Sequence, residues 1–369
     1  MATGNQAHRL VDGGESLNQA DGVRIAALGG GTGLPNVLRG LCSLLFPGAQ
    51  RGQEDCAPDR LVAIVTTTDD GGSSGRLRRE FGSIPPGDIR NCLAAVADKS
   101  LITELFQYRF PEGNGLAGHA LGNLILTALA DITGDFAKGI DIAARVVGAR
   151  ARIVPATVDR VVLSAELIDG RTVVGETAIT RAGSPIHRVS LLPTAPRSVD
   201  TAVEALRRAD VILVGPGSLY TSILPPLLIP EIREAVQQAR ALKIFILNLM
   251  TEPGETEGFD AGHHLDVVCA HLGMQPFDCV IFNTAPVPPH LLTTYAAAQS
   301  HPITVTTRDI ATMREMQVQP LGAPLAGEGP IGRIRHHPAR LAATIAACAR
   351  FDPRRATRPC EDNNVRTLL

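Results

Sequence analysis

Short apolar runs alternate with segments of helical periodicity along most of this sequence. Five of the apolar runs lie at 23–31, 61–68, 211–214, 243–250 and 278–284. A run that is apolar throughout is typical of a strand buried on both faces, and such strands form parallel sheets with helices on either side. The sequence therefore predicts an α/β fold with a mostly parallel sheet. In sheets of this kind, ligands bind beyond the carboxyl ends of the strands.

One stretch, at 151–192, breaks this alternation. It is rich in Val, Ile and Thr, and its Asp-Gly pair at 169–170 is typical of a hairpin turn. We expect a small β-rich insertion there, within a single α/β domain at 23–350. Polar segments outside the repeating pattern predict disordered tails at 1–22 and 351–369 and a local loop insertion at 47–59.

Composition excludes several classes of protein. The chain is 44% hydrophobic and 20% charged, which suits a folded domain with a large core, whereas aromatic residues make up only 4%. Few aromatics and a net charge of −2 argue against a nucleic-acid partner. Seven cysteines without a C-x-x-C pair indicate reduced thiols. With no apolar run long enough to span a bilayer and no signal-like N-terminus, we expect a cytoplasmic protein.

A cluster of glycines separates the first predicted strand from the helix that follows it. Glycine lets the backbone turn sharply and approach a ligand, and the free N–H groups at a helix start attract phosphate. Asn36 stands where a G-x-G-x-x-G fingerprint would have its third glycine, so the dinucleotide pattern is incomplete. We expect a phosphate-binding turn, with a plain tight turn as the alternative, formed by Gly29, Gly30, Gly31, Thr32 and Gly33.

The second predicted strand ends in two adjacent carboxylates, Asp69 and Asp70. They could hold a ribose hydroxyl, or Mg²⁺ beside a diphosphate, and a solvated Asx turn is the alternative. The next residues include a literal G-x-S-x-G, the nucleophile pattern of serine hydrolases, but two aspartates separate it from its strand. A flexible loop that leads into arginines suits anion binding better, and its candidate residues are Gly71, Gly72, Ser73, Ser74 and Arg76.

Two further segments carry candidate binding residues. His119 and Asn123 are four residues apart and share a helix face, although a buried core histidine is the alternative for His119. A second glycine turn after an apolar strand supplies Gly215, Gly217 and Ser218. The other histidines fit no standard zinc spacing and are expected on solvated helix faces: His263, His264, His271, His336 and His337.

Seven segments of the chain together resemble the YvcK family of bacterial proteins, often called gluconeogenesis factors, within the CofD-like superfamily. In order they read GGGTGLPNVLRGL, DDGGSSGRLRREFG, PPGDIRNCLAA, LFQYRF, GLAGHALGNL, GPGSLYTSI and NLMTEPGETEG. The resemblance covers nearly all of residues 23–350. It implies a Rossmann-like three-layer sandwich, in agreement with the alternation of strands and helices.

The resemblance also implies a function. The resemblance implies a cytosolic regulator that binds UDP-N-acetylglucosamine and links gluconeogenic carbon metabolism to cell-wall synthesis and cell shape. Cell-wall or morphogenesis proteins are the implied partners, and related folds suggest a homodimer. The resemblance places the diphosphate at Gly30–Gly33 and 69–75, and the nucleotide sugar at Tyr295 and Arg335. CofD relatives transfer a phospholactyl group from a nucleotide-activated donor with Mg²⁺, so a 2-phospho-L-lactate transferase-type enzyme is the alternative. A nicotinamide-dependent oxidoreductase is a third hypothesis, disfavoured by the incomplete fingerprint.

Overall fold

The computed structural model describes residues 22–48, 57–329 and 332–350. The predicted tails and most of the predicted 47–59 loop therefore lie outside the described residues. Within the described ranges, no helix has the length and apolar character needed to cross a membrane.

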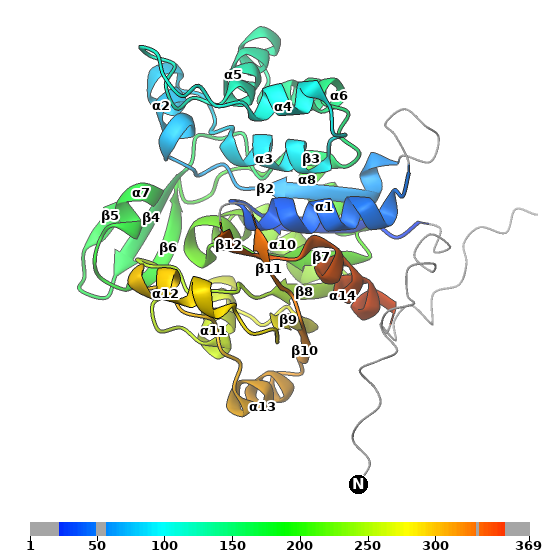
Figure 1. Cartoon of the computed structure of the whole chain (residues 1–369), viewed down its shortest axis with the longest axis vertical. Helices are drawn as coiled ribbons and strands as arrows, with labels where there is room; N and C mark the ends of the chain where they lie inside the picture. Colours follow the sequence, from blue (N-terminus) through cyan, green and yellow to red (C-terminus); the bar gives the residue numbers. More distant parts are fainter. Residues whose placement is uncertain (1–21, 49–56, 330–331, 351–369) are drawn as a thin grey trace, which may run out of the picture.

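Seven parallel strands form the central sheet, in the order β10-β9-β8-β7-β1-β2-β3 (Figure 1). The strands are β1 (Ile25–Gly29), β2 (Leu61–Val65), β3 (Arg152–Pro155), β7 (Val211–Val214), β8 (Leu242–Ile246), β9 (Cys279–Asn283) and β10 (Gln319–Ala323). The predicted parallel sheet is thus confirmed. In β1, β2 and β8 every residue is buried, because helices cover both faces.

Alternate residues of each strand serve two separate hydrophobic cores. Ile25 and Ala27 of β1 point into one core, and Ala26 and Leu28 point into the other. The first core is closed by α1 (Gly33–Leu45), α3 (Gly87–Val96), α4 (Leu101–Gln107), α5 (Leu121–Thr133), α6 (Phe136–Val146) and α14 (Pro338–Arg350). The second is closed by α8 (Asp200–Arg208), α9 (Leu224–Leu227), α10 (Pro230–Gln238), α11 (Ala261–Leu272) and α13 (Thr307–Glu315). This is the expected three-layer sandwich.

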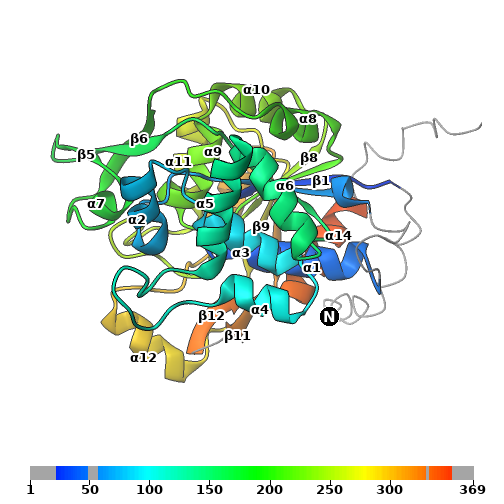
Figure 2. The ribbon, with the colours of Figure 1, turned by 90° about the horizontal axis from the view of Figure 1, so that it is seen from above.

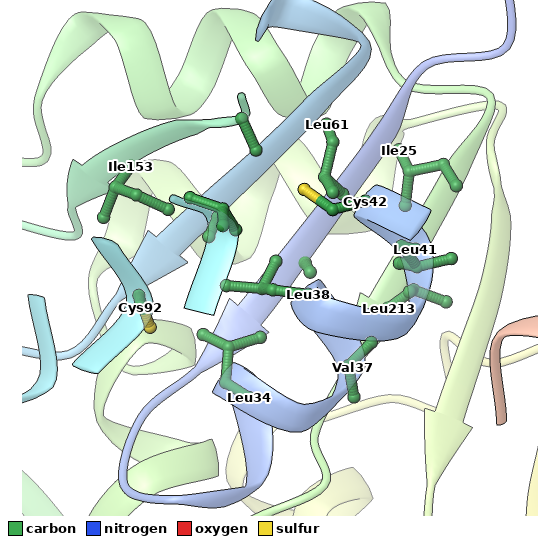
Figure 3. Close-up of a cluster of buried hydrophobic side chains, with 14 of the residues drawn as sticks. Ile25, Leu34, Val37, Leu38, Leu41, Cys42, Leu61, Cys92, Ile153 and Leu213 are labelled. Atoms are coloured by element: carbon green, nitrogen blue, oxygen red, sulfur yellow. The ribbon is translucent and has the colours of Figure 1, made fainter. Parts of the chain in front are cut away.

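Helix α1 shows how the sequence selects this packing. Its buried residues Leu34, Val37, Leu38 and Leu41 recur at helical spacing and form one apolar stripe. Figure 3 shows this stripe lying against side chains of the sheet, and Figure 2 shows α14 beside α1. Burying a side chain of this size stabilises the fold by about 1.5–3 kcal/mol relative to leaving it exposed. The glycine turn at the start of α1 is therefore fixed between a buried strand and a buried helix.

The β-rich insertion is a three-stranded antiparallel sheet that projects from one side of the domain in Figure 1. It comprises β4 (Val162–Leu167), β5 (Thr172–Val174) and β6 (Ile186–Leu192), with α7 (Glu176–Thr180) after β5. Gly170 of the Asp-Gly pair has φ +85° and turns the chain between β4 and β5. The start of the predicted stretch instead forms β3, because its buried Ile153 and Val154 extend the central sheet.

A short hairpin follows the central sheet. It consists of β11 (Ala326–Gly329) and β12 (Arg333–His336), which pair in antiparallel fashion. The hairpin buries Ile334 in a small third cluster together with Leu291 of α12 (Pro289–Ala297). This arrangement brings residues from the last tenth of the described chain to the ends of the central strands.

Candidate nucleotide-binding site

A cleft of about 690 Å³ opens beyond the carboxyl ends of β1, β7 and β8. Its floor comes from the residues that directly follow these strands, and α12 and β12 supply its other wall; Figure 2 shows these two elements side by side. The polar lining residues include Thr32, Asn36, Ser218, Asn248, Thr251, Glu252, Thr294, Tyr295, Ser300, Arg333, Arg335 and His336. The cleft has the size of a small-molecule site and the position expected for one in a parallel sheet.

The glycine turn is shaped first by its protein neighbours. A Cβ atom on Gly30 would collide with the side chains of Thr66 and Asp88, and one on Gly33 would collide with the carbonyl of Pro216. Gly31 has φ +60°, a left-handed conformation that favours glycine. Close packing and turn geometry thus explain these glycines without a ligand. Thr32 and Gly33 nevertheless line the cleft, so the turn also forms part of its wall.

The backbone N–H of Gly31 donates a hydrogen bond of 2.8 Å to Oδ2 of Asp88. Asp88 lies in the first turn of α3, but it does not cap this helix: Pro86 is the N-cap residue, and the Asp88 carboxylate turns to Gly31. Burial, and secondarily the nearby charge of Asp69, raise the pKa of Asp88 to about 6. A protein carboxylate therefore already binds an amide that the sequence assigned to phosphate.

Asp69 and Asp70 are tied to different parts of the structure. Oδ1 of Asp69 accepts a hydrogen bond from Gly71 N at 2.9 Å, the geometry of the Asx turn that was the alternative for this residue. Oδ1 of Asp70 accepts from both the backbone N (2.9 Å) and the hydroxyl (2.6 Å) of Thr177 in α7. Asp70 thus fastens the loop after β2 to the β-rich insertion. Neither residue lines the cleft.

Ser73, His119 and Asn123 form a buried hydrogen-bonded group between α2 (Gly72–Phe81) and α5. Ser73 Oγ lies 3.0 Å from His119 Nδ1, and Asn123 Nδ2 donates to the same oxygen at 3.0 Å. Burial, followed by the charge of Arg76, lowers the pKa of His119 and favours its neutral ring. The structure thus brings together Ser73 and the pair His119 and Asn123, but none of them lines the cleft. The expected shared helix face is wrong, because His119 precedes α5 and only Asn123 lies on it.

Tyr295 and Arg335, distant in sequence from the glycine turn, line the same cleft as Thr32 and Gly33. The Tyr295 hydroxyl accepts a hydrogen bond from Ile334 N at 2.9 Å, which holds α12 against β12. Both side chains are partly exposed. Burial is the main reason that the pKa of Arg335 lies below its ordinary value.

The predicted residues therefore divide into two groups. Six line the cleft: Thr32, Gly33, Gly217, Ser218, Tyr295 and Arg335. The first group also includes four glycines of the same turns that do not line the cleft: Gly29, Gly30, Gly31 and Gly215. The second group, at 69–76 with His119 and Asn123, lies on the side of α2 and α5. Gly31 connects the groups through Asp88, whose carboxylate is repelled by that of Asp69.

The segment after β8 belongs to the NLMTEPGETEG motif of the family resemblance, but none of its residues was predicted in the site. Asn248 and Glu252 both line the cleft, and Asn248 Nδ2 donates to Glu252 Oε1 at 2.8 Å. Their position at the end of an apolar strand could have identified them, because ligands bind beyond the carboxyl ends of parallel strands. The same rule identified the two glycine turns.

The prediction for the histidines is only partly right. His264, His271 and His336 are buried rather than solvated, whereas His263 and His337 are exposed. Nδ1 of His264 and of His271 each donates to a carbonyl one helical turn back, and His271 Nε2 accepts from Val189 N at 3.1 Å. Buried polar groups need such partners. Within residues 22–48, 57–329 and 332–350, no three His, Cys, Asp or Glu side chains are grouped to hold a metal ion.

The chain is similar to known proteins over most of its length. A family model described as 2-phospho-L-lactate transferase CofD matches residues 25–326. A putative gluconeogenesis factor of Nostoc sp. is 43% identical over 326 residues, covering 88% of this chain and 68% of the relative. The gluconeogenesis factor of Bacillus subtilis is 43% identical over 291 residues, covering 79% and 88%. A crystal structure of protein BH3568 from Bacillus halodurans has a TM-score of 0.81 at 40% identity, covering 88% of this chain and 99% of that one. The chain therefore belongs to the gluconeogenesis-factor family of CofD-like proteins.

Proposed function

We propose that this chain is a regulatory protein that binds UDP-N-acetylglucosamine and links gluconeogenic carbon metabolism to cell-wall synthesis and cell shape. One observation carries the proposal: residues from opposite ends of the chain, the glycine turn at Thr32–Gly33 and the pair Tyr295 and Arg335, line a single cleft. The resemblance of the sequence to its family assigns a diphosphate to the first and a nucleotide sugar to the second.

The chemistry of the cleft suits such a ligand. Backbone N–H groups at the start of α1 can bind an anionic diphosphate, and the guanidinium of Arg335 can add charge-assisted hydrogen bonds. The ring of Tyr295 offers an apolar face for a base or sugar, and its position is fixed by the hydrogen bond to Ile334.

Isothermal titration with UDP-N-acetylglucosamine tests the proposal. Arg335→Ala and Tyr295→Ala should each weaken binding by about 1–3 kcal/mol, the range for losing a charge-assisted contact or an aromatic anchor. Arg308→Ala serves as the matched control, because Arg308 is exposed on α13 and does not line the cleft. Circular dichroism verifies that each variant folds. Unchanged affinity in both cleft variants would remove these residues from the site, and no binding by the wild-type chain would refute the proposal.

A second candidate is a CofD-like transferase that uses Mg²⁺. The observation in its favour is electrostatic. Asp88 accepts a hydrogen bond from Gly31 N, burial and then the charge of Asp69 raise the pKa of Asp88, and burial followed by the charges of Asp69 and Asp88 raises the pKa of Glu176 to about 9. Asp69 and Asp70 are bonded to different partners and do not form a ready-made metal site. A diphosphate could complete one, because Mg²⁺ is often held by one or two carboxylates together with phosphates. Mg²⁺ therefore stays a prediction for the liganded protein.

Two prolonged incubations of the wild-type chain with Mg²⁺, each followed by mass spectrometry, separate the two candidates. One contains UDP-N-acetylglucosamine, and the other contains a nucleotide-activated phospholactyl donor and a deazaflavin acceptor. A regulator returns the nucleotide sugar unchanged. Conversion to a defined product that stops in EDTA would favour the transferase.

A further inference from the structure

The cleft carries opposite charges on residues that face the same space. Arg335 of β12 and Glu252 of the segment after β8 both line it. Burial raises the pKa of Glu252 and lowers that of Arg335, and the attraction between the two charges partly opposes both shifts. Both residues lie in the part of the chain that the structure describes, and their side chains form no ion pair with a nitrogen–oxygen distance of 4.0 Å or less. The two charges are therefore separated by space that a ligand can enter.

The Glu252 carboxylate is held in a defined position. Asn248 Nδ2 donates to its Oε1 at 2.8 Å, and the backbone N of Glu252 donates to Thr256 Oγ1 at 2.8 Å, which holds the main chain behind the carboxylate. Asn248 Nδ2 also reaches the Gly217 carbonyl at 3.4 Å, which links the carboxylate to the second glycine turn. Such support is typical of side chains whose orientation matters for binding.

Glu255, three residues further on, shows the contrast. Its carboxylate is buried and accepts hydrogen bonds from Tyr220 N at 3.2 Å and from the Thr221 hydroxyl at 3.0 Å. Both of its oxygens thus serve the protein interior, and Glu255 does not line the cleft. Glu252 is the acidic residue that this segment presents to the ligand space.

An ionised carboxylate only accepts hydrogen bonds and repels phosphate. It therefore contributes to binding only where the ligand offers O–H or N–H groups. A nucleotide sugar combines the two properties, because its diphosphate is anionic and its sugar and pyrimidine carry such donors. Arg335 and Glu252 match this division of charge across the cleft.

We propose that Glu252 is a specificity-determining residue that accepts a hydrogen bond from an O–H or N–H donor in the uncharged part of the nucleotide sugar, with Asn248 as the residue that positions it. This inference rests on the proposed function. Three groups of the ligand have the required chemistry: the hydroxyls or amide of the N-acetylglucosamine, the ribose hydroxyls and the pyrimidine N–H. Ligands that lack one group distinguish them.

The test is Glu252→Gln, which keeps the shape of the side chain but replaces one accepting oxygen with a donating NH₂ group. Isothermal titration should show a ~10- to 100-fold higher dissociation constant for UDP-N-acetylglucosamine, the range expected for losing a hydrogen bond to a charged group. A loss confined to UDP-sugars assigns the donor to the N-acetylglucosamine, and an equal loss for UDP assigns it to the uridine, either its ribose hydroxyls or its pyrimidine N–H. Glu315→Gln, exposed on α13, is the control.

Glu252→Asp provides a second variant that retains the charge and shortens its reach, and we expect an intermediate loss. Thermal unfolding verifies that both variants fold. Wild-type or tighter affinity in folded Glu252→Gln would overturn the inference while leaving the proposed function intact. A wild-type chain that fails to bind UDP-N-acetylglucosamine would refute both.

Discussion

Asp88→Asn should stabilise the folded protein at neutral and alkaline pH. In the native structure, burial raises the pKa of Asp88 from 3.8 to about 6, so the folded state binds a proton that the unfolded state has released between these values. Wild-type stability should therefore fall as pH rises from about 4 to about 6. One pKa unit corresponds to about 1.4 kcal/mol, so the ionised carboxylate opposes folding by up to about 3 kcal/mol above pH 6. The asparagine carbonyl can still accept the hydrogen bond from Gly31 N.

Urea unfolding from pH 4 to pH 8, in EDTA, measures the effect. The free energies of unfolding of wild type and Asp88→Asn should be similar at pH 4 and should diverge towards pH 7, with the variant more stable. Besides burial, nearby carboxylates that include Asp88 raise the pKa of Glu176, so the substitution also lowers the pKa of Glu176, and the difference between the two proteins includes this coupled titration. Asp141→Asn, on an exposed position of α6, is the control. A difference that is independent of pH, or a less stable variant at pH 8, would refute this account of Asp88.

Three further predictions concern the elements around the cleft. Gly33→Ala should lower the free energy of unfolding by about 1–3 kcal/mol, because its Cβ would collide with the Pro216 carbonyl; a melting temperature equal to wild type contradicts this. Tyr295→Phe removes the acceptor of the Ile334 N–H, at a cost of about 1 kcal/mol, and should speed amide hydrogen exchange in β12 but not in β9. Asp70→Ala leaves the Thr177 N–H without its acceptor and should make the β-rich insertion more sensitive to limited proteolysis, unlike Asp131→Ala on α5.

Local sequence patterns were sufficient for the layers of the fold. An apolar run such as 61–65 is buried on both sides only within a covered parallel sheet, and the stripe of Leu34, Leu38 and Leu41 fits only a helix packed on that sheet. These patterns repeat every two residues in strands and every 3.6 residues in helices, so residues close together in the sequence are enough to predict each element. The rule that ligands bind at the carboxyl ends of strands likewise led to the turns at 29–33 and 215–218.

The partners of individual polar side chains depended on tertiary structure. Asp88 lies in the first turn of a helix, but its carboxylate binds a backbone N–H that precedes it by 57 residues. His264 and His271 look solvated by composition, yet the fold buries them and supplies carbonyl partners.

The sequence by itself determined the α/β class, the two glycine turns and the family, because these depend on spacing and residue type along the chain. Tertiary structure alone decided that Thr32, Ser218, Glu252 and Arg335 line one cleft, and that Ser73 and His119 lie outside it. The physical reason is that a hydrogen bond or a charge interaction requires atoms a few ångströms apart. Residues far apart in the chain reach such distances only after the sheet has brought the ends of its strands together.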